Sequence, residues 1–318
     1  MNFLVTGGCG FIGRNLIARL TSAHDHRVRV VDNFSVGRPD DLMSILGEGA
    51  KRVEVVEADV ADSELARQAA VGVDVIVHLA ANTGVAPSVA NPRADCLTNV
   101  IGTLNYLEAS REAGVRRFVF ASSGAPVGDC VPPIHEELPA HPVSPYGASK
   151  LAGEAYCSAY KRSFGIDTVA LRFGNCYGLY SSHKSSVVAK FVREALEGKS
   201  WEIHGDGSQT RDFIHADDVV EAIIRAATVP GVGGEVFQIA TSRETTVREL
   251  ADKLDGILRR FGVAARELQH GDPRVGDVRR NYSDTSKARD RLDWTAKVSL
   301  DEGLQRVVEW FLQAYRRL

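Results

Sequence analysis

The chain has 318 residues, of which 44% are hydrophobic and 25% charged, with a net charge of −3. This is ordinary globular composition, sufficient for one large domain or two smaller ones. The charge and the absence of a Lys/Arg stripe argue against nucleic-acid binding, and no apolar run reaches membrane-spanning length. Five scattered cysteines without C-x-x-C spacing predict free thiols in a reducing cytoplasm, and nothing predicts a metal site.

The N-terminus reads as a short apolar strand that runs into glycines. We expect a buried strand over 3–5, a tight turn containing Gly7, Gly10 and Gly13, and a helix over 11–20. A terminus that is already a core strand argues against a signal peptide. A helix N-terminus carries a partial positive charge and free N–H groups, and glycines let the backbone approach an anion. The segment therefore predicts a pyrophosphate site, although an ordinary strand-to-helix turn can look similar.

A second strand over 27–31 ends in Asp32, about 20 residues past the glycines, where a carboxylate accepts hydrogen bonds from an adenosine ribose. Strand, glycines, helix, strand and acid in this order predict dinucleotide binding. Asp32 would repel a 2′-phosphate, so NAD is favoured over NADP, while the nearby Arg38 leaves NADP open.

Strands and helices then alternate along the chain. We expect strands over 53–56, 73–79, 118–122 and 167–173, and helices from 63, over 92–113 and over 145–164. This pattern predicts a doubly wound parallel Rossmann sheet in the α/β class. After a loop over 179–186 we expect a helix over 187–196, short segments near 201 and 212, and helices near 217, 246, 284 and 300. These form a smaller mixed lobe. The predicted division is 1–172 with 206–242 for the dinucleotide and 173–205 with 243–318 for the substrate.

Tyr146 and Lys150 stand four residues apart at a predicted helix start, and at that spacing they share a face. Ser122 and Ser123 close the preceding strand. A tyrosine with an ordinary pKa near 10 needs about 4 kcal/mol of differential stabilisation to act as a base near pH 7. A lysine ammonium and a positive nicotinamide ring could supply it, and a serine hydroxyl could hold the reacting oxygen. Alone, such a pair is common on amphipathic helices; its place after the fifth strand favours chemistry.

Together these segments resemble the extended short-chain dehydrogenase/reductases of the nucleotide-sugar epimerase/dehydratase family. The resemblance covers essentially the whole chain and includes 6–13, Asp32-Asn33, Asp59-Val60, 78–81, Asn99, Ser122-Ser123, Tyr146 with Lys150, 172–178, 205–215 and 274–277. It implies that Tyr146 is the base, that Lys150 tunes it and holds the nicotinamide ribose, and that Ser123 orients the sugar 4-hydroxyl.

The resemblance also implies which residues hold tightly bound NAD. They are Gly7, Gly10, Phe11, Ile12, Gly13, Asp32, Asn33, Asp59, Val60, Leu79, Ala80, Ala81, Asn99, Ser122, Tyr146, Lys150 and Phe173. Asp59 would meet the adenine amine, although a lone Asp after a strand is more often a turn or helix cap. The histidines His78 and His215 are expected to be structural.

The implied nucleotide-sugar contacts come mostly from the second half of the chain. They are Ser123, Tyr146, Asn175, Val187, Ile203, His204, Arg211, Arg274, Asp277 and Asn281. Arg211 and Arg274 would be forks for the diphosphate, because guanidinium pairs bidentately with phosphate oxygens. Val187, Ile203 and His204 would pack the uracil, and Asn281 would gate the C2 substituent of the sugar.

Family members oxidise C4 of a nucleotide-linked sugar and differ in the fate of the 4-keto intermediate. Dehydratases carry an Asp-Glu pair just after the catalytic serine or threonine, and UDP-glucuronate decarboxylases carry a Glu; here Gly124 and Ala125 stand there. The resemblance therefore implies 4-epimerization of a UDP-sugar, either UDP-glucose/UDP-galactose or the N-acetylhexosamine pair. Relatives usually have Val-Tyr-Gly next, whereas this chain has Pro126-Val127-Gly128, so we expect the loss of the aromatic side chain to reshape the sugar pocket.

Other readings stay open from the sequence. One is a dehydratase, decarboxylase or 4-keto reductase of the same family, and another is a catalytically silent NAD-binding regulator. The resemblance also implies a homodimer through the helices over 92–113 and 145–164.

Overall fold

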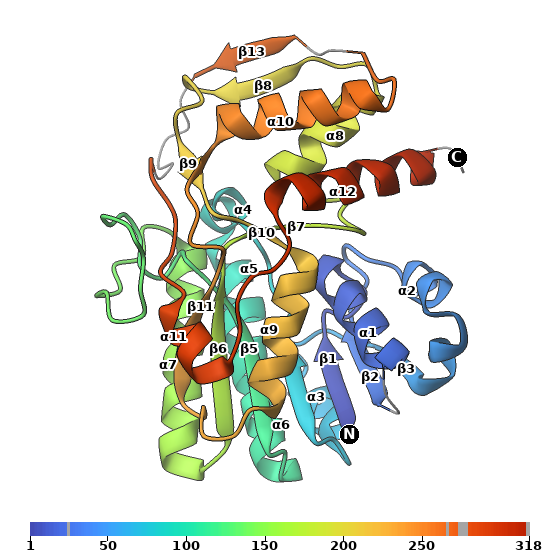
Figure 1. Ribbon diagram of the computed structural model, residues 1–318. Coiled ribbons are helices and arrows are strands. Elements are labelled where there is room, and N and C mark those ends of the chain that lie inside the picture. The colour runs from blue at the N-terminus through green and yellow to red at the C-terminus, as the bar shows by residue number, and fades with distance from the viewer. Residues whose placement is uncertain (24–25, 265–266, 273–278, 316–318) are drawn as a thin grey trace.

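The computed structural model describes residues 1–23, 26–264, 267–272 and 279–315. Its centre is a seven-stranded sheet in the order β11-β6-β5-β4-β1-β2-β3, and every neighbouring pair is parallel. In that order the strands are Glu235–Ile239, Asp167–Phe173, Arg117–Ser123, Val75–His78, Asn2–Thr6, Arg27–Asp32 and Val53–Glu57. The predicted doubly wound α/β fold is confirmed (Figure 1).

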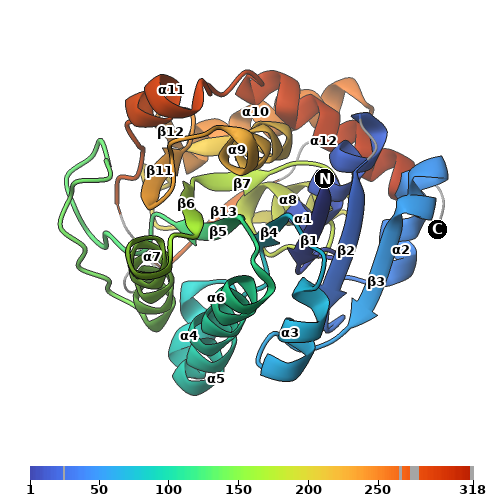
Figure 2. The ribbon, with the colours of Figure 1, turned by 90° about the horizontal axis from the view of Figure 1, so that it is seen from below.

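Helices cover both faces of this sheet. Figure 2 shows α3, α6 and α7 (Ser63–Ala70, Gly102–Ala113 and Pro145–Phe164) on one side, and α1, α9 and α11 (Phe11–Ala23, Ala216–Thr228 and Ser286–Leu292) on the other. Alternate strand residues enter different cores: Phe3 and Val5 pack in the core of the α1 and α9 side, and Leu4 in the core of the α3, α6 and α7 side. Burial on both faces explains why the strands read as continuous apolar runs.

The helix expected over 92–113 is continuous but not regular. It consists of α5 (Pro92–Cys96), a π-helical turn η2 (Leu97–Ile101) and α6. Gly102, at the start of α6, packs so closely that an added Cβ would lie 2.7 Å from Cγ2 of Val60. A π turn adds one residue to a helical turn and is often found at functional sites. Here it contains Asn99, whose side chain reaches the loop after β4.

The C-terminal part builds a separate lobe above the carboxyl ends of the sheet (Figure 1). Its third apolar core draws on α8, β8, α10 and α12 (Val187–Leu196, Trp201–His204, Val247–Arg260 and Leu300–Tyr315). The short strand pairs are β7 (Asn175–Tyr177) with β10 (Phe213–His215), β9 (Thr210–Arg211) with β12 (Thr245–Thr246), and β8 with β13 (Leu268–Gly271).

Several predicted elements have the bounds expected from the sequence, including α7, β6 and α8. The sequence analysis did not predict α2 (Pro39–Leu46), α4 (Val85–Ala90), the 3₁₀ segment η1 (Gly47–Arg52) or the edge strand β11. Within the described part of the chain, no helix is both long and apolar enough to cross a membrane.

Candidate active site

The glycine turn between β1 and α1 has little room for side chains. Gly7 has a left-handed φ of 68°, and an added Cβ would lie 2.8 Å from the backbone nitrogen of Ala80. At Gly13 an added Cβ would lie 2.5 Å from the carbonyl oxygen of Gly7. Gly7, Gly10 and Gly13 all line one pocket, and the first residues of α1 line it too. Backbone at that end can therefore approach an anion directly.

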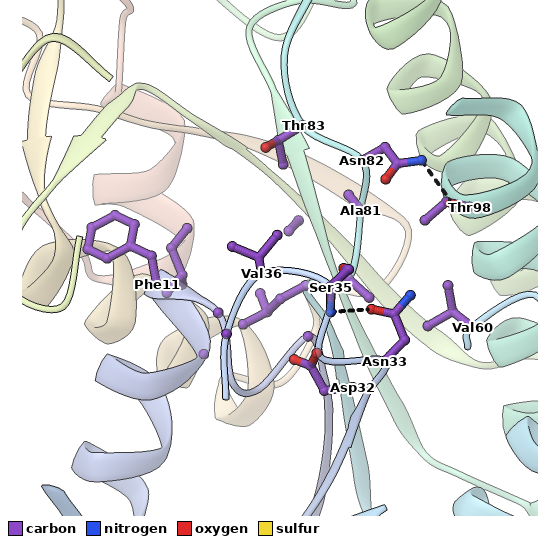
Figure 3. Close-up of a pocket in the computed structure, with 18 of the residues that line it drawn as sticks. Phe11, Asp32, Asn33, Ser35, Val36, Val60, Ala81, Asn82, Thr83 and Thr98 are labelled. Atoms are coloured by element: carbon purple, nitrogen blue, oxygen red, sulfur yellow. Dashed lines mark hydrogen bonds between the residues drawn. The ribbon is translucent and has the colours of Figure 1, made fainter. Parts of the chain in front are cut away.

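Asp32 stands at the end of β2 in the same pocket (Figure 3). Its Oδ2 accepts a hydrogen bond from the Cys9 backbone N–H at 2.9 Å, and its Oδ1 accepts one from Phe34 at 2.9 Å. Each carboxylate oxygen can accept a second hydrogen bond. The Asp32 side chain can therefore accept from both hydroxyls of a ribose. Burial raises the pKa of Asp32, and the two backbone hydrogen bonds oppose that shift.

Most of the residues expected to hold NAD line this pocket. They are Gly7, Gly10, Phe11, Ile12, Gly13, Asp32, Asn33, Val60, Leu79, Ala80, Ala81, Ser122, Tyr146, Lys150 and Phe173. Glycines without space for a Cβ, an acceptor carboxylate and a helix N-terminus fit a dinucleotide. Arg38 is exposed and is not among the described lining residues, which favours an unphosphorylated ribose.

Two expected NAD residues are not among the residues that line the pocket. Asp59 accepts a hydrogen bond from Nδ2 of Asn33 at 3.0 Å and another from the Ala61 backbone at 2.9 Å, so it holds a turn. Asn99 is buried; its Oδ1 accepts from the Asn82 backbone at 2.8 Å, and its Nδ2 donates to Asp95 at 2.9 Å. Both residues position neighbours that do line the pocket, namely Asn33 and Asn82.

The sequence analysis missed several lining residues, including Ser35, Val36, Asn82, Thr83, Thr98, His183 and Lys184. Figure 3 shows Asn82 joined to Thr98, a bond of 3.1 Å, across the pocket from the loop that carries Ser35 and Val36. Apart from Thr98, which lies in η2, these residues come from loops, and only their position after β2, β4 and β7 could have indicated them.

The start of α7 brings the catalytic candidates together. Ser144 is the N-cap, accepting a hydrogen bond from the Gly147 backbone at 3.1 Å, and Pro145 occupies the first helical position. This fixes the first turn, from which Tyr146 and Lys150 face the end of β5. The Ser123 side chain lies close enough to Tyr146 to lower the pKa of its hydroxyl. Nζ of Lys150 donates to the carbonyl oxygen of Ala121 at 2.9 Å and lies 5.9 Å from the Tyr146 ring centroid.

Burial dominates the electrostatics of this group. It raises the pKa of Tyr146, while the hydrogen bond from Ser123 lowers it and Asp95 raises it further. Burial also lowers the pKa of Lys150 to about 8, against the opposing attraction of Asp95 and Glu154. The side chains of the site alone therefore do not lower the pKa of the Tyr146 hydroxyl toward neutral pH. A further positive charge beside Tyr146 is needed for it to act as a base.

A second pocket adjoins the first on the side of the C-terminal lobe. The two share Phe11, Ile12, Thr83, Ser122, Tyr146, Phe173 and Lys184, so they form one continuous cleft. Of the expected sugar-nucleotide residues, Ser123, Tyr146, Asn175 and Val187 line it. No carboxylate belongs to the part of its lining that the structure describes.

Three other expected substrate residues belong to the C-terminal half of the chain. Ile203 is buried in the third core, and His204 bonds the Asp272 carbonyl through Nδ1 at 3.2 Å. Arg211 donates from Nη1 to the Thr210 carbonyl at 2.6 Å. None of these three lines either pocket. Arg274 and Asp277 lie outside the described residues.

Asn281 stands near the residue that follows Ser123. Its Nδ2 would lie 4.0 Å from a Cβ added to Gly124, the residue after Ser123. The sequence analysis also missed Cys176, Tyr177, Ser186 and Phe213, which line the second pocket from strands and loops of the C-terminal half.

Comparisons with known proteins agree with this geometry. Residues 3–240 match the model of the NAD dependent epimerase/dehydratase family. A UDP-glucose 4-epimerase from Mycolicibacterium smegmatis is 40% identical over 316 residues, which cover 98% of each chain. A crystal structure of the Thermotoga maritima UDP-glucose 4-epimerase with UDP-glucose superposes with a TM-score of 0.91 at 37% identity, covering 99% of this chain and 100% of that one.

A third comparison concerns a different sugar. The UDP-N-acetylglucosamine 4-epimerase from Methanobrevibacter ruminantium, solved with UDP-N-acetylmuramic acid, has a TM-score of 0.90 at 29% identity and 98% coverage of both chains. The family match, the identities and the cleft lead to one conclusion. The chain belongs to the NAD-dependent epimerase/dehydratase family, in the short-chain dehydrogenase/reductase group.

Proposed function

We propose that this protein is a UDP-sugar 4-epimerase that interconverts UDP-glucose and UDP-galactose or the corresponding N-acetylhexosamine pair. The observation that carries the proposal is the continuous cleft. Ser123, Tyr146 and Lys150 stand where the dinucleotide pocket meets a second pocket whose described lining contains no carboxylate. The names of the similar proteins support the same substrate class.

The residues of the first pocket would hold NAD in a defined orientation. Asp32 would accept from the adenosine ribose, the N-terminus of α1 would face the pyrophosphate, and Lys150 would hold the nicotinamide ribose. When bound, NAD supplies a hydride acceptor that can return the hydride, and its oxidised ring adds the positive charge that Tyr146 needs.

Tyr146 would act as the general base and then as the general acid. Its phenolate takes the proton of the C4 hydroxyl as C4 is oxidised, and it returns that proton when the 4-keto sugar is reduced on its other face. Ser123, which lines the second pocket together with Tyr146, would hold the C4 oxygen in both steps. Lys150 stays protonated and stabilises the phenolate. The sequence of steps inverts C4 with no net redox change.

Each alternative activity within the family requires a further catalytic group or a further reactant. A dehydratase must remove a proton at C5 and protonate a leaving hydroxyl at C6, which requires acid/base groups facing the sugar. Gly124 and Ala125 supply none, and the described lining adds no carboxylate. A 4-keto reductase would need a stoichiometric reductant. A silent NAD-binding regulator is disfavoured by the intact arrangement of Ser123, Tyr146 and Lys150.

For the sugar nucleotide we propose Asn175 and Val187 as contacts in the second pocket. The remaining candidates would reach the ligand from the C-terminal half. They are Ile203, His204, Arg211, Arg274, Asp277 and Asn281. We also propose the two-part division at 1–172 with 206–242 and 173–205 with 243–318. The packing of α9 and β11 against the central sheet supports the assignment of 206–242 to the first part. Ala288 and Trp294 also pack in this core, which argues against assigning all of 243–318 to the second part.

The decisive experiment is incubation of purified protein with a panel of UDP-, GDP-, dTDP- and CDP-sugars, with products resolved by NMR and no cofactor added. We expect a C4-epimer mixture from a UDP-sugar alone, and NAD released when the protein is denatured. A 4-keto-6-deoxy product would establish a dehydratase instead, and activity that consumes an added reductant stoichiometrically would establish a reductase.

We further propose a homodimer that works in the cytoplasm. Exposed apolar side chains gather on neighbouring helices of one side of the sheet: Val85 and Val89 on α4, Leu97 and Ile101 on η2, and Tyr156 and Phe164 on α7. All five cysteines are unpaired, in keeping with a reducing compartment. Sedimentation equilibrium tests the dimer, and a monomer at micromolar concentration would contradict it.

A further inference from the structure

Lys184 occupies a distinctive position in the cleft. It lies in the loop between β7 and α8 and lines both the NAD pocket and the substrate pocket. Among the described lining residues of the substrate pocket, it is the only lysine or arginine. In the dinucleotide pocket the other lysine is Lys150, whose ammonium is engaged with the Ala121 carbonyl.

The Lys184 ammonium has no ionic partner in the described part of the chain. Its backbone N–H donates to the Ser181 carbonyl at 2.9 Å, which holds the loop in a turn. Its Nζ makes no hydrogen bond or ion pair with any residue that the structure describes. Burial lowers the pKa of this half-buried amine. A cation kept partly out of water without a counter-charge is costly unless a ligand supplies the charge.

The wall beside Lys184 is also suited to an anion. Ser186 and Val187 line the same pocket at the start of α8, and Ser186 makes no side-chain capping bond there. The first turn of α8 contains no acidic residue. The positive end of a ten-residue helix and an ammonium therefore border one pocket that lacks a described carboxylate.

Of the two guanidiniums expected to hold the substrate diphosphate, that of Arg211 does not take this place, and Arg274 lies outside the described residues. Arg211 lines neither pocket and donates to the Thr210 carbonyl. The NAD pyrophosphate already has the N-terminus of α1 and the glycine turn. We propose that Lys184 binds the diphosphate of the sugar nucleotide and thereby anchors the substrate while the keto sugar turns. This inference rests on the proposed function, and the group that Lys184 would bind is a diphosphate.

Lys184→Gln tests the proposal by calorimetric titration with UDP and with uridine. We expect UDP binding to weaken about 10- to 100-fold, the size of one or two charge-assisted hydrogen bonds, while uridine binding is unchanged. Lys184→Arg should restore most of the UDP affinity. The matched control is Lys190→Gln, since Lys190 lies on α8, pairs with Glu194 at 3.7 Å and lines neither pocket.

NAD content and UDP affinity together show whether Lys184 binds the diphosphate of the cofactor or that of the sugar nucleotide. The NAD content of each purified variant should stay equal to that of the wild type. Lys184→Gln protein that loses NAD but binds UDP normally would assign the ammonium to the cofactor and overturn the proposal. Equal loss of UDP and uridine affinity would show a structural effect and would also overturn it.

The failure of this inference differs from failure of the proposed function. Wild-type protein that does not bind UDP contradicts the substrate class and, with it, the role of Lys184. Wild-type and Lys184→Gln proteins that bind UDP equally contradict the role of Lys184 alone.

Discussion

Arg172 and Glu154 form a buried ion pair between β6 and α7, beside the proposed catalytic residues. Nε and Nη2 of Arg172 donate to the two carboxylate oxygens of Glu154 at 2.8 and 2.7 Å, and both side chains are 5% exposed. Glu154 also accepts from the Ser122 hydroxyl. The pair thus joins the strand that ends in Ser123 to the helix that carries Tyr146 and Lys150.

Arg172→Met should destabilise the fold strongly, because it leaves the Glu154 carboxylate buried without its partner. We expect the free energy of unfolding to fall by about 3–5 kcal/mol. Arg289→Met is the control: it removes an exposed pair with Asp290 and should cost less than about 0.5 kcal/mol. Urea denaturation followed by circular dichroism measures both, and equal midpoints for the two variants would contradict the assigned role.

Tyr146→Phe should reduce the rate of epimerization by at least about 100-fold, as expected when a positioned base is removed. UDP affinity and NAD content should be unchanged, because the phenyl ring still fills the wall of the cleft. Tyr156→Phe on the same helix is the control, since Tyr156 lines neither pocket and should keep its activity. Near-normal turnover of Tyr146→Phe would exclude this residue as the base.

Activity should fall as the pH rises above about 8, because Lys150 loses its charge there. Burial has lowered the pKa of this lysine from 10.5 to about 8, so its ammonium is present below that pH and lost above it. Lys150→Arg should remove this alkaline limb, since arginine stays charged, although its maximal rate should be lower. The test is the pH dependence of kcat for both proteins. A wild-type rate that is flat up to pH 10 would refute the assignment.

Histidine 78 should make the fold sensitive to acid. His78 is buried against Tyr106, Phe118 and Phe120, its Nδ1 bonds the Thr6 hydroxyl, and burial lowers its pKa from 6.5 to about 3. The unfolded chain takes up the proton below pH 6.5 and the folded one does not. The free energy of unfolding therefore falls as the pH drops from 6.5 toward 3, and this loss is about 2 kcal/mol at pH 5.

The check on this prediction is urea unfolding at pH 7 and pH 5 for the wild type and His78→Phe. The variant loses the bond to Thr6 at both pH values, so only the difference between them is informative. The wild type should lose about 2 kcal/mol more than the variant; equal losses would show that His78 does not titrate on unfolding.

Asn281→Tyr should narrow the choice of sugar. Asn281 lies beside Gly124, the residue after Ser123, and tyrosine at this position would fill space for a C2 substituent. We expect kcat/KM for a UDP-N-acetylhexosamine to fall at least about 10-fold relative to that for the matching UDP-hexose, the size of a steric clash with one small group. Parallel losses on both substrates would place Asn281 outside the sugar pocket.

Elements with strong local signals followed from the sequence. Helix α7 has an N-cap serine, a proline at its first position and a glycine in the left-handed conformation after Phe164, so local chemistry determines both of its ends. Strand β6 is centred on the buried apolar run Val169-Ala170-Leu171. In contrast, β11 is a strand because its residues pair with β6 at the sheet edge, a contact between residues more than 60 positions apart.

The candidate site divides in the same way. The sequence by itself determined the glycine turn, Asp32, and the placing of Ser123, Tyr146 and Lys150, because each depends on spacing within one turn or on the end of one strand. Only the tertiary structure decided that Asp59 and Asn99 do not line the NAD pocket, that Arg211 lines neither pocket, and that Lys184 lines both. Those positions depend on how loops from distant parts of the chain pack over the sheet, which no local pattern encodes.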